Sequence, residues 1–294
     1  MKPGNDRQAR LLGLIFICWF CSAGAEDVRF SRGLLFEISW EAVAPCYLFG
    51  TIHSEDPRVL ALPPEVQLAF DQADVFAMEA IPDAEAIIHS MITMVYTDGR
   101  TLEGVIGPGL YGQALEALSD LDLPEAAVKD FKPWAVVTLL SVPRAVTGDF
   151  LDMQLYKAAD AGGKTVIGLE SIEEQLAVFD GLDESDQIAL LRETLEARDI
   201  LPQFFERLLT LYVERDLAGL LHLSDEYLRG GNPQLAERFK EAALDVRNVR
   251  MARRMAPYLR TGGCFIAVGA LHLPGTGGVL ERLHGNGFHV RAVY

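Results

Sequence analysis

Two tetrapeptides of the form Gly-x-x-His stand far apart in this sequence, at Gly50-Thr51-Ile52-His53 and Gly269-Ala270-Leu271-His272. Each follows a short apolar run, residues 47–49 and 264–268, of the kind that forms a buried strand. A histidine just past the carboxyl end of such a strand lies at the edge where open α/β sheets bind ligands. His53 and His272 would meet there if their strands are neighbours. Because neutral imidazole is a common metal ligand, a metal is the simplest reason for the pairing.

A carboxylate joins the two histidines. Glu79 ends the apolar run 75–78, which follows a predicted helix over residues 64–73. In a parallel βαβ unit the second strand returns to the same edge as the first, so we expect Glu79 beside His53. Two imidazoles and a carboxylate match the three-ligand open site of a hydrolytic metal centre, with Glu79 as third ligand or as general base. Zinc, manganese and cobalt all suit these ligands.

Two further charged residues are candidates for catalysis beside Glu79. Glu170 ends the β-branched run 164–170 and could be a ligand, an acid next to the ligands, or an ordinary helix cap. Arg247 could bind a substrate carboxylate or an oxyanion through its planar guanidinium, or be a solvated side chain among neighbouring arginines.

These residues require an α/β fold with a small, mainly parallel sheet. We predict that the sheet is built from two βαβ units, residues 47–78 and 264–293, with an additional strand at 34–40. A large helical insertion fills approximately residues 83–260. Its apolar spacing predicts helices at 83–96, 111–119, 133–142, 149–161, 185–197, 202–214, 217–229 and 233–259.

The first residues have the features of a signal peptide. Lys2, Arg7 and Arg10 precede an apolar core at residues 11–21, and the small residues 23–25 follow it. We therefore predict cleavage after Ala25, a periplasmic or secreted protein, and a single domain over 26–294. No later run is apolar for long enough to span a membrane.

Composition limits the partners. The formal net charge is −16 and half of the residues are hydrophobic, which indicates a folded acidic protein. Such a surface repels nucleic acid and anionic lipid. The sequence does not specify the oligomeric state.

Two cysteines remain after the predicted cleavage, Cys46 and Cys264, each a few residues before a Gly-x-x-His motif. If the two strands are adjacent and parallel, both thiols lie near the edge opposite the histidines. In an oxidising compartment they could form a disulfide, or they could be two separate buried thiols.

Four segments resemble motifs of the TraB/PrgY/GumN family, in the family's order: residues 47–53, 75–79, 165–170 and 268–275. The resemblance runs from about Trp40 to the C-terminus. The animal Tiki proteins of this family are metal-dependent proteases, and more distant relatives include erythromycin esterases and haem-binding ChaN proteins. The family's paired Gly-x-x-His motifs fall on His53 and His272, and its strand-end glutamate falls on Glu79.

The pair Arg247-Asn248 resembles the family's Arg-Asn pair, which marks both as candidate substrate-binding residues. The acidic residue that often precedes the pair is replaced by Val246, with Asp245 one position further back. The resemblance implies a peptidase-like or other hydrolytic centre. With the predicted signal peptide, we therefore expect an exported metal-dependent hydrolase that acts on a peptide or small-molecule substrate. The alternatives are a non-catalytic binding protein for a peptide signal, a metal ion or haem, and a structural role for the glycine-histidine turns.

Overall fold

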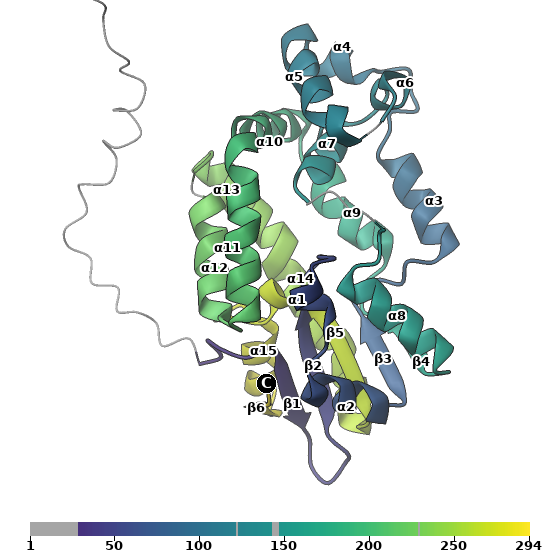
Figure 1. Ribbon diagram of the computed structural model, residues 1–294, viewed down its shortest axis with the longest axis vertical. Coiled ribbons are helices and arrows are strands. Elements are labelled where there is room, and N and C mark those ends of the chain that lie inside the picture. The colour runs from purple at the N-terminus through teal and green to yellow at the C-terminus, as the bar shows by residue number, and fades with distance from the viewer. Residues whose placement is uncertain (1–28, 122, 143–146, 229) are drawn as a thin grey trace, which may run out of the picture.

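The strand order of the sheet places the two histidine-bearing strands side by side. The computed structural model describes residues 29–121, 123–142, 147–228 and 230–294, and in these ranges six strands form one sheet in the order β4-β3-β5-β2-β1-β6 (Figure 1). The strands are β1 (Leu35–Ser39), β2 (Cys46–Thr51), β3 (Val75–Met78), β4 (Thr165–Gly168), β5 (Cys264–Gly269) and β6 (His289–Ala292).

Four of these strands are parallel. β5 pairs with β2 on one side and with β3 on the other, and β4 extends the parallel part beyond β3. β1 is antiparallel to both β2 and β6. The predicted fold class is confirmed: an α/β fold with a mainly parallel sheet. The two strands of each predicted βαβ unit are separated, because β5 lies between β2 and β3, while β2 and β1 lie between β5 and β6.

Helices cover both faces of the sheet. Helix α2 (Pro64–Gln72) begins with a proline in its first turn and buries Val66, Ala69 and Phe70, a spacing that makes one apolar face. It lies with α8 (Leu151–Ala161) in front of the sheet in Figure 1, whereas α14 (Val246–Thr261) lies behind it. The core between these layers is continuous and includes stacked phenylalanines from β3 and β5.

Most of the predicted helical insertion stands above the carboxyl edge of the sheet in Figure 1, whereas α8 and α14, which belong to the same range, flank the sheet. A second apolar core, centred on Leu102, Tyr111 and Leu191, holds much of it together. The other helices of the fold are α1 (Pro57–Leu60), α3 (Ala84–Thr93), α4 (Leu102–Ile106), α5 (Pro108–Leu118), α6 (Glu125–Val128), α7 (Pro133–Leu140), α9 (Ile172–Asp180), α10 (Glu184–Glu196), α11 (Leu201–Val213), α12 (Leu217–Leu228), α13 (Pro233–Lys240) and α15 (Val279–Gly285), with 3-10 turns at Ser119–Leu121, Arg198–Ile200 and Ala270–His272.

The predicted helix over 233–259 is helical throughout, but it contains a π-helical turn. Helix α13 ends at Lys240, a π-helical turn covers Glu241–Asp245, and α14 begins at Val246. A π turn adds one residue to the helical repeat, so it rotates everything after it by about 100°. The rotation turns Met251 and Met255 into the core. Helix α9 is a second difference, since the sequence analysis predicts no helix at 172–180.

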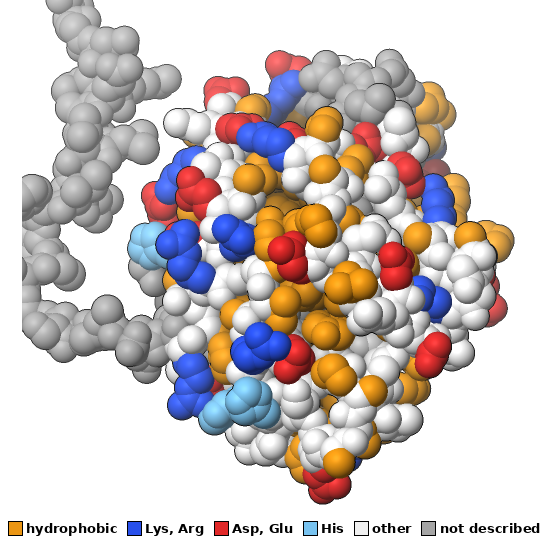
Figure 2. Space-filling model, turned by 60° about the horizontal axis from the view of Figure 1, so that its bottom comes forward, with side chains coloured by type: hydrophobic (Ala, Val, Ile, Leu, Met, Phe, Trp, Pro, Cys, Tyr) orange, Lys and Arg blue, Asp and Glu red, His pale blue; other side chains and the backbone are white. Residues whose placement is uncertain are grey.

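The predicted signal peptide, residues 1–25, lies outside the described residues. Among the described helices none has the length and apolar character needed to cross a membrane. On the face shown in Figure 2, acidic and basic side chains are interspersed around exposed apolar atoms.

The two cysteines start the neighbouring strands β2 and β5. Cys46 directly precedes Tyr47 and Cys264 directly precedes Phe265, and these two following residues are paired in the β2–β5 register. The Cys264 backbone N–H donates to Cys46 Sγ at 3.3 Å. Both are buried free thiols. Whether they bond in an oxidising compartment stays a prediction.

Candidate metal centre

The predicted site residues that end strands all lie at the same edge of the sheet. His53, Glu79, Glu170 and His272 follow the carboxyl ends of β2, β3, β4 and β5, which are parallel neighbours. The topology therefore brings together residues that are far apart in the sequence, as the parallel arrangement requires.

The glycines of the two motifs allow this close approach. A Cβ on Gly50 would lie 2.7 Å from Leu273 Cδ1 and 3.2 Å from the Cα of Ala270. A Cβ on Gly269 would lie 3.2 Å from Glu79 Oε1, which accepts the Gly269 N–H at 2.7 Å. Each glycine therefore makes room for a group that follows a neighbouring strand.

His272 is buried and held by an amide. Its side chain is 6% exposed, and its Nδ1 lies 2.7 Å from Asn248 Oδ1. The Nδ2 of Asn248 donates to the Gly277 carbonyl at 3.0 Å, so Oδ1 faces the ring as an acceptor. Nδ1 then carries the hydrogen and Nε2 keeps its lone pair. Burial lowers the pKa of His272, which favours this neutral form.

His53 is mostly exposed and contacts a carboxylate that the sequence analysis missed. Its ring stacks on Phe150, with centroids 5.5 Å apart, and its Nδ1 lies 3.2 Å from Asp152 Oδ2. The other oxygen, Asp152 Oδ1, accepts a hydrogen bond from Thr51 Oγ1 at 2.6 Å. The contact with Asp152 raises the pKa of His53, and burial opposes this only in part.

Glu79 is fixed from three sides. Its Oε1 accepts the Gly269 N–H and lies 3.6 Å from His272 Nε2, while its Oε2 accepts from Gln175 Nε2 at 3.1 Å and from Arg247 at 2.6 Å. Burial opposes ionisation, but His272, Arg247 and the Gly269 N–H outweigh it and lower the pKa of Glu79 to about 2. The carboxylate is therefore ionised at neutral pH.

Glu170 anchors the basic face of α14. Its side chain is fully buried, with Oε2 accepting from Arg247 Nε and Oε1 accepting from Arg250, both at 2.8 Å. One turn further along the helix, Arg254 pairs with Glu174 at 2.5 Å. Arg247 is thus held between Glu79 and Glu170 with its side chain only 14% exposed, rather than being solvated among its neighbours.

The described residues do not form an assembled metal cage. In these ranges no three His, Cys, Asp or Glu side chains are grouped closely enough to hold an ion. The donor chemistry nevertheless fits a borderline divalent cation. Both histidines turn Nδ1 towards an oxygen and leave Nε2 for a ligand bond, the arrangement that outer groups impose on metal-binding histidines. Glu79 Oε1 lies beside the Nε2 of His272.

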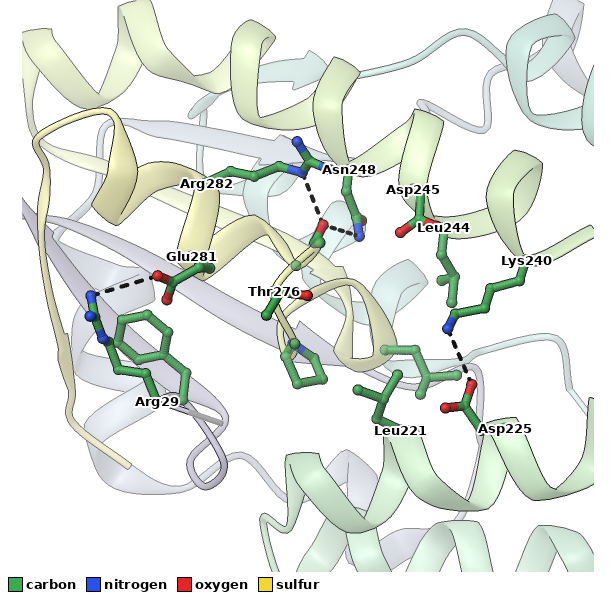
Figure 3. A pocket seen from close by; sticks show the side chains of 16 residues that line it. Arg29, Leu221, Asp225, Lys240, Leu244, Asp245, Asn248, Thr276, Glu281 and Arg282 are labelled. Carbon is green, nitrogen blue, oxygen red and sulfur yellow. Dashed lines mark hydrogen bonds and ion pairs between the residues drawn. The ribbon is translucent and has the colours of Figure 1, made fainter. Parts of the chain in front are cut away.

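A pocket of about 670 Å³ lies beside Asn248 (Figure 3). Asn248 forms part of its wall, and residues 274–278 and the π-helical turn line it further. Lys240 and Asp225 pair at 3.4 Å on one side, and Figure 3 shows the Asp245 carboxylate near Asn248 and Leu244. Asn248 therefore borders this pocket and also holds the ring of His272.

Comparisons with known proteins identify the family of the chain. The profile of the TraB/PrgY/gumN family matches residues 34–292. The chain is similar to the metalloprotease TIKI1 of Danio rerio, with 26% identity over 84% of this chain and 60% of the relative. It thus spans about three fifths of that protein's length. No solved structure matches the chain.

Proposed function

The chain belongs to the TraB/PrgY/gumN family, and from this premise we propose that it is an exported metal-dependent hydrolase that cleaves peptide bonds. The observation that carries the proposal is the matched state of His53 and His272. They follow adjacent parallel strands, and the Nδ1 of each lies close to an oxygen atom, 3.2 Å in His53 and 2.7 Å in His272, so that the Nε2 of each ring is available to a ligand. A structural role for the turns does not require this matching.

In this proposal His53, His272 and Glu79 hold a divalent transition metal ion. When bound, such an ion supplies Lewis-acid activation of water and of a carbonyl group. The chain's own residues hold the ligands in place: Gly269 and Gln175 fix the Glu79 carboxylate, and Asn248 fixes His272. Arg247 places a cation next to Glu79, where a substrate carboxylate or a developing oxyanion would be stabilised.

The choice of a peptide substrate rests on the relative. TIKI1 is called a metalloprotease, and the family resemblance extends over most of this chain. Export rests on the signal-peptide features of residues 1–25. A periplasmic or secreted protein would meet peptide substrates outside the cytosol.

The test is cleavage of a peptide library by purified residues 26–294, supplied in turn with zinc, manganese and cobalt and followed by mass spectrometry. His289→Ala is the matched control, because this exposed histidine lies on β6 away from the site. We expect wild type and control to cleave the same peptides with one of the ions, and His53→Ala and His272→Ala to be inactive.

The same experiment separates the alternative. Suppose instead that the wild-type protein retains peptide or haem in stoichiometric amount and releases no product, while the two histidine variants retain none. That result would replace the hydrolase by a binding protein. Cleavage that survives in both histidine variants would contradict the proposed site.

A further inference from the structure

Asp152 has a buried oxygen without a hydrogen bond. Its Oδ1 accepts from Thr51, but its Oδ2 has no hydrogen-bond partner and is the one such buried side-chain atom recorded among the described residues. Leaving a buried carboxylate oxygen unsatisfied is costly, so an unpaired acceptor of this kind requires an explanation.

The missing donor is next to it. His53 Nδ1 lies 3.2 Å from Asp152 Oδ2, a distance suited to a hydrogen bond, although the ring is not aligned to donate one. The ring is 68% exposed and stacks on Phe150, so little protein packing opposes a rotation that would align Nδ1 with this oxygen.

The segment that carries Asp152 is tied to the turn that carries His53. The Glu55 carboxylate, two residues after His53, accepts the backbone N–H groups of Thr147, Gly148 and Asp149. Asp152 follows in the first turn of α8, where the helix dipole favours a negative side chain. The carboxylate and the imidazole are therefore held together through both backbone and side chains.

We propose that Asp152 is the positioning residue of His53: its Oδ2 accepts the Nδ1 hydrogen and thereby fixes the ring with Nε2 unprotonated and facing the ligand edge. Asp152 acts through His53, since its Oδ2 is buried behind the ring. This positioning role rests on the proposed function only in one respect, namely that the ligand bound by His53 Nε2 is a metal ion. The two histidines then differ in kind, because the exposed ring has a charged partner and the buried ring has a neutral amide.

The test is the protonation state of the His53 ring in metal-free protein labelled with ¹⁵N-histidine. Nitrogen shifts distinguish the two neutral forms, at an alkaline pH where the imidazoles are uncharged, and His53→Gln identifies the signals. The main variant is Asp152→Asn. Thr51 Oγ1 donates to Oδ1, so the asparagine keeps its oxygen on Thr51 and turns its NH₂ towards Nδ1.

We expect Nδ1–H in wild type and a shift of the hydrogen to Nε2 in Asp152→Asn, as follows when an amide replaces the carboxylate partner of a histidine. Calorimetric titration with zinc, manganese and cobalt should show affinity reduced about 10- to 100-fold in Asp152→Asn. Asp149→Asn is the matched control, because Asp149 pairs with Lys157 on the same segment, and it should behave as wild type.

The outcomes separate the two proposals. If His53 carries its hydrogen on Nδ1 in both wild type and Asp152→Asn, with equal metal affinity, the positioning role is overturned. If the wild-type protein binds no metal, but the Nδ1 hydrogen of His53 is present in wild type and lost in Asp152→Asn, the positioning role stands and the proposed function fails. Asp152→Ala, checked for folding by thermal melting, should also lose the Nδ1 preference.

Discussion

The Nδ1 atom of His272 lies 2.7 Å from the Oδ1 atom of Asn248, and this contact determines which nitrogen of a buried ring is free to bind a ligand. Asn248 can play this part because its amide nitrogen is occupied by the Gly277 carbonyl. The loop after the second Gly-x-x-His motif therefore orients the histidine of that motif through a side chain of α14.

Asn248→Ala should weaken metal binding and stability together. It removes the acceptor of the His272 N–H and leaves that buried donor unsatisfied, which costs about 1–3 kcal/mol in the free energy of unfolding. Metal affinity should fall about 10- to 100-fold. Asn248→Asp keeps an acceptor for the ring and should bind metal more tightly than Asn248→Ala. Calorimetric titration and urea unfolding measure both effects; unchanged affinity in Asn248→Ala would mean that the contact does not orient the ring.

Glu170→Gln should destabilise the fold. Glu170 is fully buried and pairs with Arg247 and Arg250. The substitution therefore removes the anion that these two partly buried guanidinium groups share and leaves each with one other carboxylate, Glu79 and Glu174 respectively. Breaking a buried ion pair in this way costs about 3 kcal/mol or more. Chemical denaturation measures the change, with the exposed Glu173→Gln as control. Equal stability of wild type and Glu170→Gln would show that this ion-pair network does not support the fold.

Acid should remove the contribution of Glu174 to stability. Hydrogen bonds from Arg254 lower the pKa of Glu174 to about 2, with burial opposing and the Ser171 N–H and Arg250 assisting. A carboxyl with a lowered folded-state pKa stabilises the fold above its ordinary pKa of 4.5, and the effect is lost as the pH falls towards 2.

Glu174→Gln should therefore be less stable than wild type at neutral pH, and the two should converge on acidification. Urea unfolding at a series of pH values tests this. Glu65→Gln, which alters an exposed glutamate in the first turn of α2, is the control. A stability difference that stays constant down to pH 2 would contradict the assignment.

Gly278 should not tolerate a side chain. A Cβ there would overlap the carbonyl oxygens of Leu273 and Pro274, which are backbone atoms and cannot move aside cheaply. We expect Gly278→Ala to cost about 3 kcal/mol. Gly278 is the N-cap of α15, and Gly285 is the last residue of that helix, with no atom near its Cβ position. Gly285→Ala should therefore be neutral or stabilising by about 0.5 kcal/mol. Thermal melting compares them, and equal melting temperatures would refute the steric argument.

The strand-end residues could be predicted from sequence because their signal is local. A buried parallel strand ends where its apolar run ends, so His53, Glu79, Glu170 and His272 could all be assigned to one edge before the strand order was known. Helix α9 also has a local signal: Ser171 and Glu174 form a capping box, a pattern that indicates a helix start.

The contacts around those residues could not be predicted, because they depend on packing between distant segments. Asp152 precedes no motif and meets His53 only because the first turn of α8 reaches the end of β2, where Thr51 donates to it. The π-helical turn before Arg247 leaves no trace in the apolar spacing, since the run 233–259 is amphipathic with or without the extra residue. Without that rotation, Asn248 and Arg247 could not be assigned to His272 and to the two glutamates.

The central claim is that one divalent ion binds between the two Gly-x-x-His motifs. Metal analysis of purified residues 26–294 after reconstitution with zinc, manganese or cobalt tests it most directly, beside the His53→Ala/His272→Ala double variant and His289→Ala. We predict one equivalent of metal in wild type and in His289→Ala, and none in the double variant, with circular dichroism unchanged in all three. Absence of metal from wild type with every ion, or full metal content in the double variant, would contradict the account.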